Sequence, residues 1–92
     1  MRFVAGERDV RSGILLSDVP VGGGGSVVGI VDRDDPVGDR LASLGFLPGT
    51  SVTVLRRAPL GDPTVYELRG YQLCLRRREA ERVLVTGAEA GS

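Results

Sequence analysis

The sequence predicts a mainly β fold, a small barrel of about five antiparallel strands with one short α-helix. Val and Leu dominate the apolar residues, with 13 and 11 copies against 2 Phe, 2 Tyr and no Trp, and β-branched residues such as Val favour strands. The 14 Gly and 5 Pro are typical of short strands joined by tight turns. Closing such strands into a barrel also removes exposed strand edges.

The length of 92 residues suits one domain with one modest core. Residues 1–13 mix charge and glycine without a period, so we expect a flexible N-terminal arm there and a flexible C-terminal tail over 87–92. The domain then occupies residues 14–86. Residues 17–21 predict a turn or an irregular strand. The glycine run 22–25 predicts a flexible loop, because glycine loses much backbone entropy on ordering.

The helix has recognisable start and stop signals. In the pair Asp35-Pro36, the aspartate can cap free backbone amides and the proline suits the first helical position. Apolar residues at helical spacing then predict a helix over 36–44. Gly45 stands where a left-handed C-terminal cap belongs.

The strands are predicted from apolar runs bounded by turn-forming residues. Leu47-Pro48-Gly49-Thr50 has the proline and glycine that a type II turn requires, and Arg69-Gly70 predicts a tight reversal. A single helical turn within 77–82 would place Ala80 inward. The expected strands are 26–31, 51–56, 65–69, 71–76 and 83–85.

The composition excludes most catalytic and metal chemistry. The chain has no His and one Cys, Cys74, so neither a Ser-His-Asp triad nor a zinc site of His and Cys ligands can form. We therefore expect no enzyme, no cofactor and no metal site. One Cys fits a reducing compartment, and no apolar run approaches the ~18 residues of a membrane span. We expect a cytoplasmic protein without membrane insertion.

The charges leave one alternative function open. The 12 basic and 12 acidic residues cancel, which argues against attraction of the whole surface to nucleic acid, so no nucleic-acid partner is expected. The arginine runs 56–57 and 76–78 would nevertheless suit a nucleic-acid-binding barrel. Solvated strand ends paired with acidic residues explain the same runs; the expected partners are Glu67, Glu79 and Glu81. Tyr66 and Tyr71, the nearest aromatic residues, both fit inward strand positions.

A second alternative is a metal sensor built on the aspartates between residues 32 and 39. Carboxylates can hold a hard cation through oxygen ligands. The calcium-loop spacing is not met, and strand termination with helix capping explains the same aspartates without a metal. The group consists of Asp32, Asp34, Asp35 and Asp39.

Two motifs at a fixed separation resemble the FeoA family of small accessory proteins of bacterial ferrous iron uptake. Residues 40–49 read R-L-A-S-L-G-F-L-P-G and residues 58–63 read A-P-L-G-D-P. The resemblance runs from about Leu15 to Val85. It implies an SH3-like barrel and a partner, the membrane ferrous iron transporter FeoB, which carries a cytosolic GTP-binding domain.

By this resemblance the protein is an accessory or regulatory module that docks on the cytosolic side of FeoB. A stand-alone relative of the SH3-like domain of metal-dependent repressors is the remaining alternative. Leu60 at a hairpin tip has no evident core position, and fold maintenance does not explain an arginine on the helix. We expect the partner-facing residues to be Arg40, Leu44, Phe46, Arg57 and Leu60, and an arginine such as Arg40 or Arg57 could assist GTP hydrolysis in trans.

Overall fold

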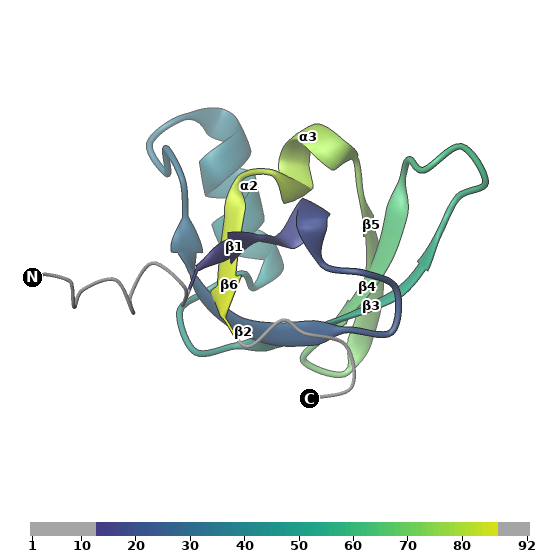
Figure 1. The fold of residues 1–92 in the computed structure, drawn as a ribbon. Coiled ribbons are helices and arrows are strands. Elements are labelled where there is room, and N and C mark those ends of the chain that lie inside the picture. Colours follow the sequence, from purple (N-terminus) through teal and green to yellow (C-terminus); the bar gives the residue numbers. More distant parts are fainter. Residues whose placement is uncertain (1–12, 87–92) are drawn as a thin grey trace, which may run out of the picture.

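The computed structural model describes residues 13–86. The expected tail over 87–92 and all of the expected arm but Gly13 lie outside them. The strands are β1 (Ile14–Leu15), β2 (Gly24–Ile30), β3 (Ser51–Arg57), β4 (Thr64–Leu68), β5 (Tyr71–Leu75) and β6 (Val83–Thr86). The helical segments are η1 (Leu16–Asp18), α2 (Pro36–Leu44) and α3 (Arg77–Ala80). The prediction of a mainly β fold is confirmed (Figure 1).

The six strands form one antiparallel sheet in the order β1-β6-β2-β3-β4-β5. Strand β2 pairs with β3 through Gly24–Ser26 and with β6 through Ser26–Ile30. Register shifts after Val27 and after Val54 mark bulges, which bend strands and increase their twist. The sheet therefore curls without closing. The expectation of a fully closed barrel is wrong, since β1 and β5 remain edge strands in the part of the chain described.

The core fills the inside of this curled sheet. Its side chains come from every strand except β1, from η1, α2 and α3, and from the loops after η1 and α2. Ala80 points inward from α3, as predicted. The buried apolar residues are Leu16, Val19, Val27, Leu41, Phe46, Val52, Val54, Tyr66, Leu68, Leu75, Ala80, Val83 and Val85.

The local signals for α2 act as predicted. The Asp35 carboxylate accepts a hydrogen bond from the Gly38 amide (2.9 Å), and Pro36 is the first helical residue. Gly45 ends the helix with φ 115° in the left-handed region. No helix within residues 13–86 is long and apolar enough to cross a membrane.

The glycine run 22–25 differs from the expected loop. Its second half begins β2, and the Gly22 amide in the preceding turn donates to the Val54 carbonyl (2.9 Å). At Gly24 a Cβ would lie 2.4 Å from the Val52 carbonyl oxygen. Glycine is present there because β2 and β3 approach too closely for a side chain. The run is therefore an ordered turn followed by the start of β2, not a flexible loop.

Candidate functional site

The loop between β3 and β4 presents an isolated apolar side chain. Leu60 is 97% exposed, more than any other large apolar residue that the structure describes. The loop is closed by a hydrogen bond from the Ala58 amide to the Pro63 carbonyl (3.0 Å), and a second one from Gly61 to Ala58 (2.7 Å) forms a turn inside it. Leu60 therefore does not fold back on the core, and an ordered loop holds it in solvent.

Side-chain hydrogen bonds fix this loop to the rest of the domain. The Asp62 carboxylate accepts from the backbone amide of Arg77, the first residue of α3 (2.9 Å). The Arg57 guanidinium donates to the Thr64 hydroxyl and to the Val19 carbonyl, both at 3.0 Å. Arg57, expected to face a partner, thus has donors directed into the protein, where they support the base of the hairpin.

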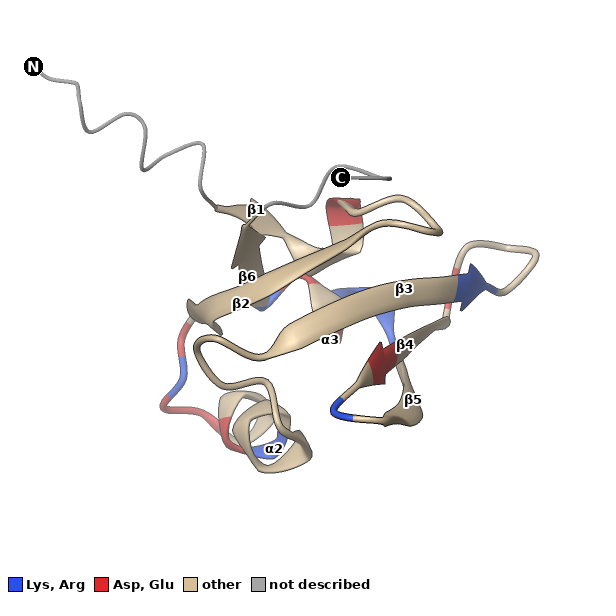
Figure 2. Cartoon of the chain, turned by 90° about the horizontal axis from the view of Figure 1, so that it is seen from below, with Lys and Arg blue, Asp and Glu red and all other residues tan. Residues whose placement is uncertain are grey.

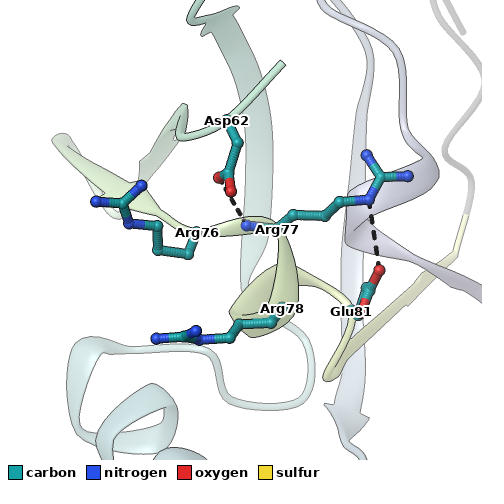
Figure 3. Close-up of a pocket in the computed structure, with 5 residues that line it drawn as sticks. All are labelled: Asp62, Arg76, Arg77, Arg78 and Glu81. Carbon is teal, nitrogen blue, oxygen red and sulfur yellow. Dashed lines mark hydrogen bonds and ion pairs between the residues drawn. The ribbon is translucent and has the colours of Figure 1, made fainter. Parts of the chain in front are cut away.

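A hollow of about 520 Å³ lies between this loop and α3. Its lining residues are Asp62, Arg76, Arg77, Arg78 and Glu81. Figure 3 shows the Arg76 and Arg78 side chains extending to one side of α3 and the Arg77 side chain extending to the other, towards Glu81 (Nε–Oε2 3.4 Å). Within residues 13–86, no carboxylate forms an ion pair with Arg76 or Arg78.

The expected pairing of the arginine runs with glutamates holds only in part. Arg77 pairs with Glu81, but Glu79 pairs with Arg40 on α2 instead. The Arg40 side chain is half exposed. Its guanidinium is therefore at the surface, where it is paired with the Glu79 carboxylate. The pair joins α2 to α3.

Phe46 is wrong as a partner-facing residue, because it is completely buried. The Gly45 amide donates to the Ala42 carbonyl (3.0 Å) and the Phe46 amide to the Leu41 carbonyl (3.2 Å). This is the Schellman pattern of helix termination, in which the residue after the glycine packs against the last turn of the helix. The apolar residue directly after Gly45 was a signal for burial rather than for exposure.

The predicted site residues do not form one surface. Leu44 is half buried against the core, and its carbonyl accepts a hydrogen bond from the Tyr71 hydroxyl. Figures 1 and 2 place α2 and the tip of the β3–β4 hairpin at different ends of the molecule. Of the five residues expected to face a partner, Leu60 projects fully and Arg40 in part, whereas Arg57 and Phe46 serve the fold.

Two of the four aspartates near α2 have structural partners for their carboxylates. Asp35 caps the helix and also accepts from the Arg82 guanidinium (2.8 Å), and Asp39 pairs with Arg33 (3.5 Å). The hydrogen bond from Arg82, followed by that from Gly38, lowers the pKa of Asp35 below its ordinary value. In the described part of the chain, no group of three or more His, Cys, Asp or Glu residues is placed to hold a metal ion.

The tyrosines do not form a stacking platform beside the arginines. Tyr66 is buried as expected, and burial raises the pKa of its hydroxyl. Tyr71 is 42% exposed, so its expected inward position is wrong. It begins β5 directly after the Arg69-Gly70 turn, where its hydroxyl bonds to the end of α2. Figure 2 shows basic and acidic residues interspersed rather than gathered on one face.

The chain is similar to known proteins over most of its length. A sequence model of the FeoA domain family matches residues 14–87. Over 46 residues, 50% of this chain, the sequence is 39% identical to a Porphyromonas gingivalis protein described as an Fe(2+) transport protein A/Fe(2+) transporter FeoB fusion protein. The matched stretch is 6% of that protein, so the chain spans only a small part of this curated relative.

Solved structures show the same fold. A FeoA-like protein from Clostridium acetobutylicum is 35% identical, with a TM-score of 0.78 over 88% of this chain and 94% of that one. The zinc complex of FeoA from Stenotrophomonas maltophilia, described as an SH3 domain protein, is 31% identical, with a TM-score of 0.71 over 78% and 88%. The predicted SH3-like fold is confirmed. A manganese-dependent transcriptional repressor, 22% identical with a TM-score of 0.72 over 80% of this chain and 41% of that one, shares the fold alone.

Proposed function

Because this chain belongs to the FeoA domain family, which is linked to ferrous iron transport, we propose that it is an accessory module that docks on the cytosolic side of a FeoB-type transporter. The observation that carries this proposal is the Porphyromonas gingivalis relative, in which transport protein A and the transporter are one chain. A fusion holds its two parts at a high effective concentration. Such an arrangement favours parts that bind each other.

The β3–β4 loop supplies a suitable contact for docking. Leu60 presents its whole side chain to solvent, and the loop is already ordered by its own backbone hydrogen bonds and by Asp62. An ordered loop loses little conformational entropy on binding, and a few apolar anchors carry most of the energy of an interface. We therefore assign Leu60 as the main anchor, and we infer that the protein acts by binding rather than by catalysis.

The experiment is a binding titration of the full chain against the purified, detergent-solubilised transporter of the same organism. We expect saturable binding that Leu60→Ser weakens by about tenfold or more, the loss of an interface anchor. Leu47→Ser is the matched control, because Leu47 is also exposed (45%) but follows α2 at the other end of the molecule. It should bind as the unchanged protein does.

Two results would contradict the proposal. One is the absence of binding to the transporter, whether its GTP-binding domain is empty or holds GDP or GTP, together with unchanged ferrous iron uptake in cells that lack the protein. The other is equal weakening by Leu60→Ser and Leu47→Ser, which would remove the β3–β4 loop as the docking contact.

A further inference from the structure

We propose that the hollow between the β3–β4 loop and α3 binds an acidic peptide segment of the partner, with carboxylates on Arg76 and Arg78 and a neighbouring apolar side chain on Leu60. The inference rests on the proposed docking function and adds the chemistry of the segment that is recognised. The arginine runs in the sequence did not show which arginines lack an acidic partner, and the structure does.

The charges in the hollow are unevenly satisfied. Its two carboxylates are already engaged, since Asp62 accepts from the Arg77 amide (2.9 Å) and Glu81 pairs with the Arg77 side chain (3.4 Å). Arg76 and Arg78 have no carboxylate partner among residues 13–86. The hollow is therefore complementary to an anion that brings two negative groups.

The backbone beneath these two arginines is held by carboxylates. The Arg76 amide donates to Glu79 (2.9 Å), whose carboxylate also pairs with Arg40 on α2. The next amide, that of Arg77, is bound by Asp62. The backbone amides of Arg76 and Arg77 are thus fixed at the junction of β5 and α3. The Arg76 side chain extends from this held backbone, and Arg78 follows within α3.

The side-chain geometry suits carboxylates. Arg76 has an extended backbone (φ −71°, ψ 155°) and Arg78 lies two residues further on, within α3. Figure 3 shows that both side chains extend to the same side. A guanidinium offers a planar fork of donors that matches a carboxylate, so two of them on one side can take two acidic side chains of one segment.

Leu60 gives the site its second chemical component. It stands two residues before Asp62, which lines the hollow and ties the loop to α3, so the exposed leucine belongs to the same ordered loop as one wall of the hollow without lining it. This combination of an apolar side chain and two guanidinium groups favours a peptide that carries an apolar residue as well as carboxylates. It does not favour a nucleic acid, because Tyr66 is buried and the Tyr71 hydroxyl is bound at the end of α2, leaving neither ring beside the arginines for base stacking.

The test uses the full chain and a fluorescein-labelled synthetic peptide in which one leucine is flanked on both sides by glutamates. Fluorescence anisotropy should show binding that weakens as salt is added, because exposed charges are screened. The double variant Arg76→Gln/Arg78→Gln should bind about tenfold more weakly, the loss of two exposed ion pairs. The control Arg33→Gln/Arg69→Gln removes the same charge at other loops and should bind as the unchanged protein does.

Several outcomes would overturn the inference. They are equal binding of a peptide with glutamines in place of the glutamates, full displacement by inorganic phosphate, preference for a uridine oligonucleotide, or a self-association that the double variant abolishes. The transporter titration separates this inference from the docking proposal. If Arg76→Gln/Arg78→Gln binds the transporter normally while Leu60→Ser does not, docking holds and the acidic segment is refuted. If the peptide binds as expected and the transporter does not, the docking proposal fails alone.

Discussion

The guanidinium of Arg82 donates a hydrogen bond to the carboxylate of Asp35 (2.8 Å), joining residues 47 positions apart in the sequence. The same guanidinium donates to the carbonyls of Val31 and Asp32. One side chain just before β6 thus holds both ends of the connection between β2 and α2. Asp35 has two roles at once, since it also caps the helix through the Gly38 amide.

This pair predicts how stability depends on acid. The pKa of Asp35 is lower in the folded protein than its ordinary value of 3.8, chiefly because of the hydrogen bond from Arg82. The stability that the charged form contributes is therefore present above that value and is lost as the pH falls below it. We expect Asp35→Asn, which keeps a capping side chain, to reduce the loss of stability in urea unfolding between about pH 5 and pH 2. An acid profile of Asp35→Asn identical to that of the unchanged protein would contradict the assignment.

Two glycines of β2, Gly24 and Gly29, should respond differently to replacement by alanine. A Cβ at Gly24 would lie 2.4 Å from the Val52 carbonyl oxygen, whereas a Cβ at Gly29 would meet nothing within 4 Å. We expect Gly24→Ala to lower the free energy of unfolding by about 1–3 kcal/mol, since β2 and β3 must separate. Gly29→Ala should change it by less than about 0.5 kcal/mol. Urea unfolding at 25 °C measures both, and a neutral Gly24→Ala would show that the strands have room to move.

Phe46 and Leu47 are sequence neighbours with opposite environments. Phe46 is completely buried and Leu47 is 45% exposed. We expect Phe46→Ala to cost about 3–5 kcal/mol of unfolding free energy, or to prevent folding, because it removes a core aromatic side chain. Leu47→Ala should cost less than about 1 kcal/mol. Thermal unfolding followed by circular dichroism compares them, and similar losses for the two variants would refute the placement of Phe46.

The hydrogen bonds of Arg57 predict that replacing this residue lowers the stability of the fold rather than acting on GTP bound to the transporter. Its guanidinium bridges the Thr64 hydroxyl and the Val19 carbonyl, both at 3.0 Å, a geometry that a lysine ammonium does not reproduce. We expect Arg57→Lys to lower the unfolding free energy by about 1–2 kcal/mol. Arg56→Lys, at the exposed neighbouring position, should change it by less than about 0.5 kcal/mol.

A comparison with the transporter completes this test. If Arg57 acted on bound GTP, Arg57→Lys would change the transporter's hydrolysis rate while the fold stayed intact. We expect instead that any change in this rate follows the loss of folded protein. A rate effect without a stability effect would contradict the structural role.

Features with local chemistry could be predicted from the sequence. Asp35-Pro36 starts α2 and Gly45 ends it, because capping depends on residues a few positions apart. The turn at Gly49 and the Arg69-Gly70 reversal were predicted in the same way, because glycine favours the left-handed backbone that such turns require. In the structure Gly49, Arg69 and Gly70 all have positive φ values. Together with the apolar runs, these signals give α2 and the positions along the sequence of β2 to β6, whereas β1 was not among the expected strands.

Features that depend on strand pairing could not be predicted. Gly24 resembles any loop glycine until β3 is placed beside it. Whether the sheet closes depends on how far two bulges bend it. The hollow could not be predicted for the same reason, since two of its lining residues, Asp62 and Arg77, are 15 positions apart and are joined by a hydrogen bond. Phe46 is the exception, because the pattern around Gly45 held a local signal for its burial.

The strands that come first and last in the sequence, β1 and β6, are neighbours in the sheet. β1 pairs with β6, with Ile14 opposite Val85, while the β3–β4 hairpin lies towards the far side in both views (Figures 1 and 2). A tether joined to either end of the domain therefore leaves from the same corner. For this architecture the order of two fused genes is geometrically equivalent, since either order leaves the Leu60 loop facing away from the point of attachment.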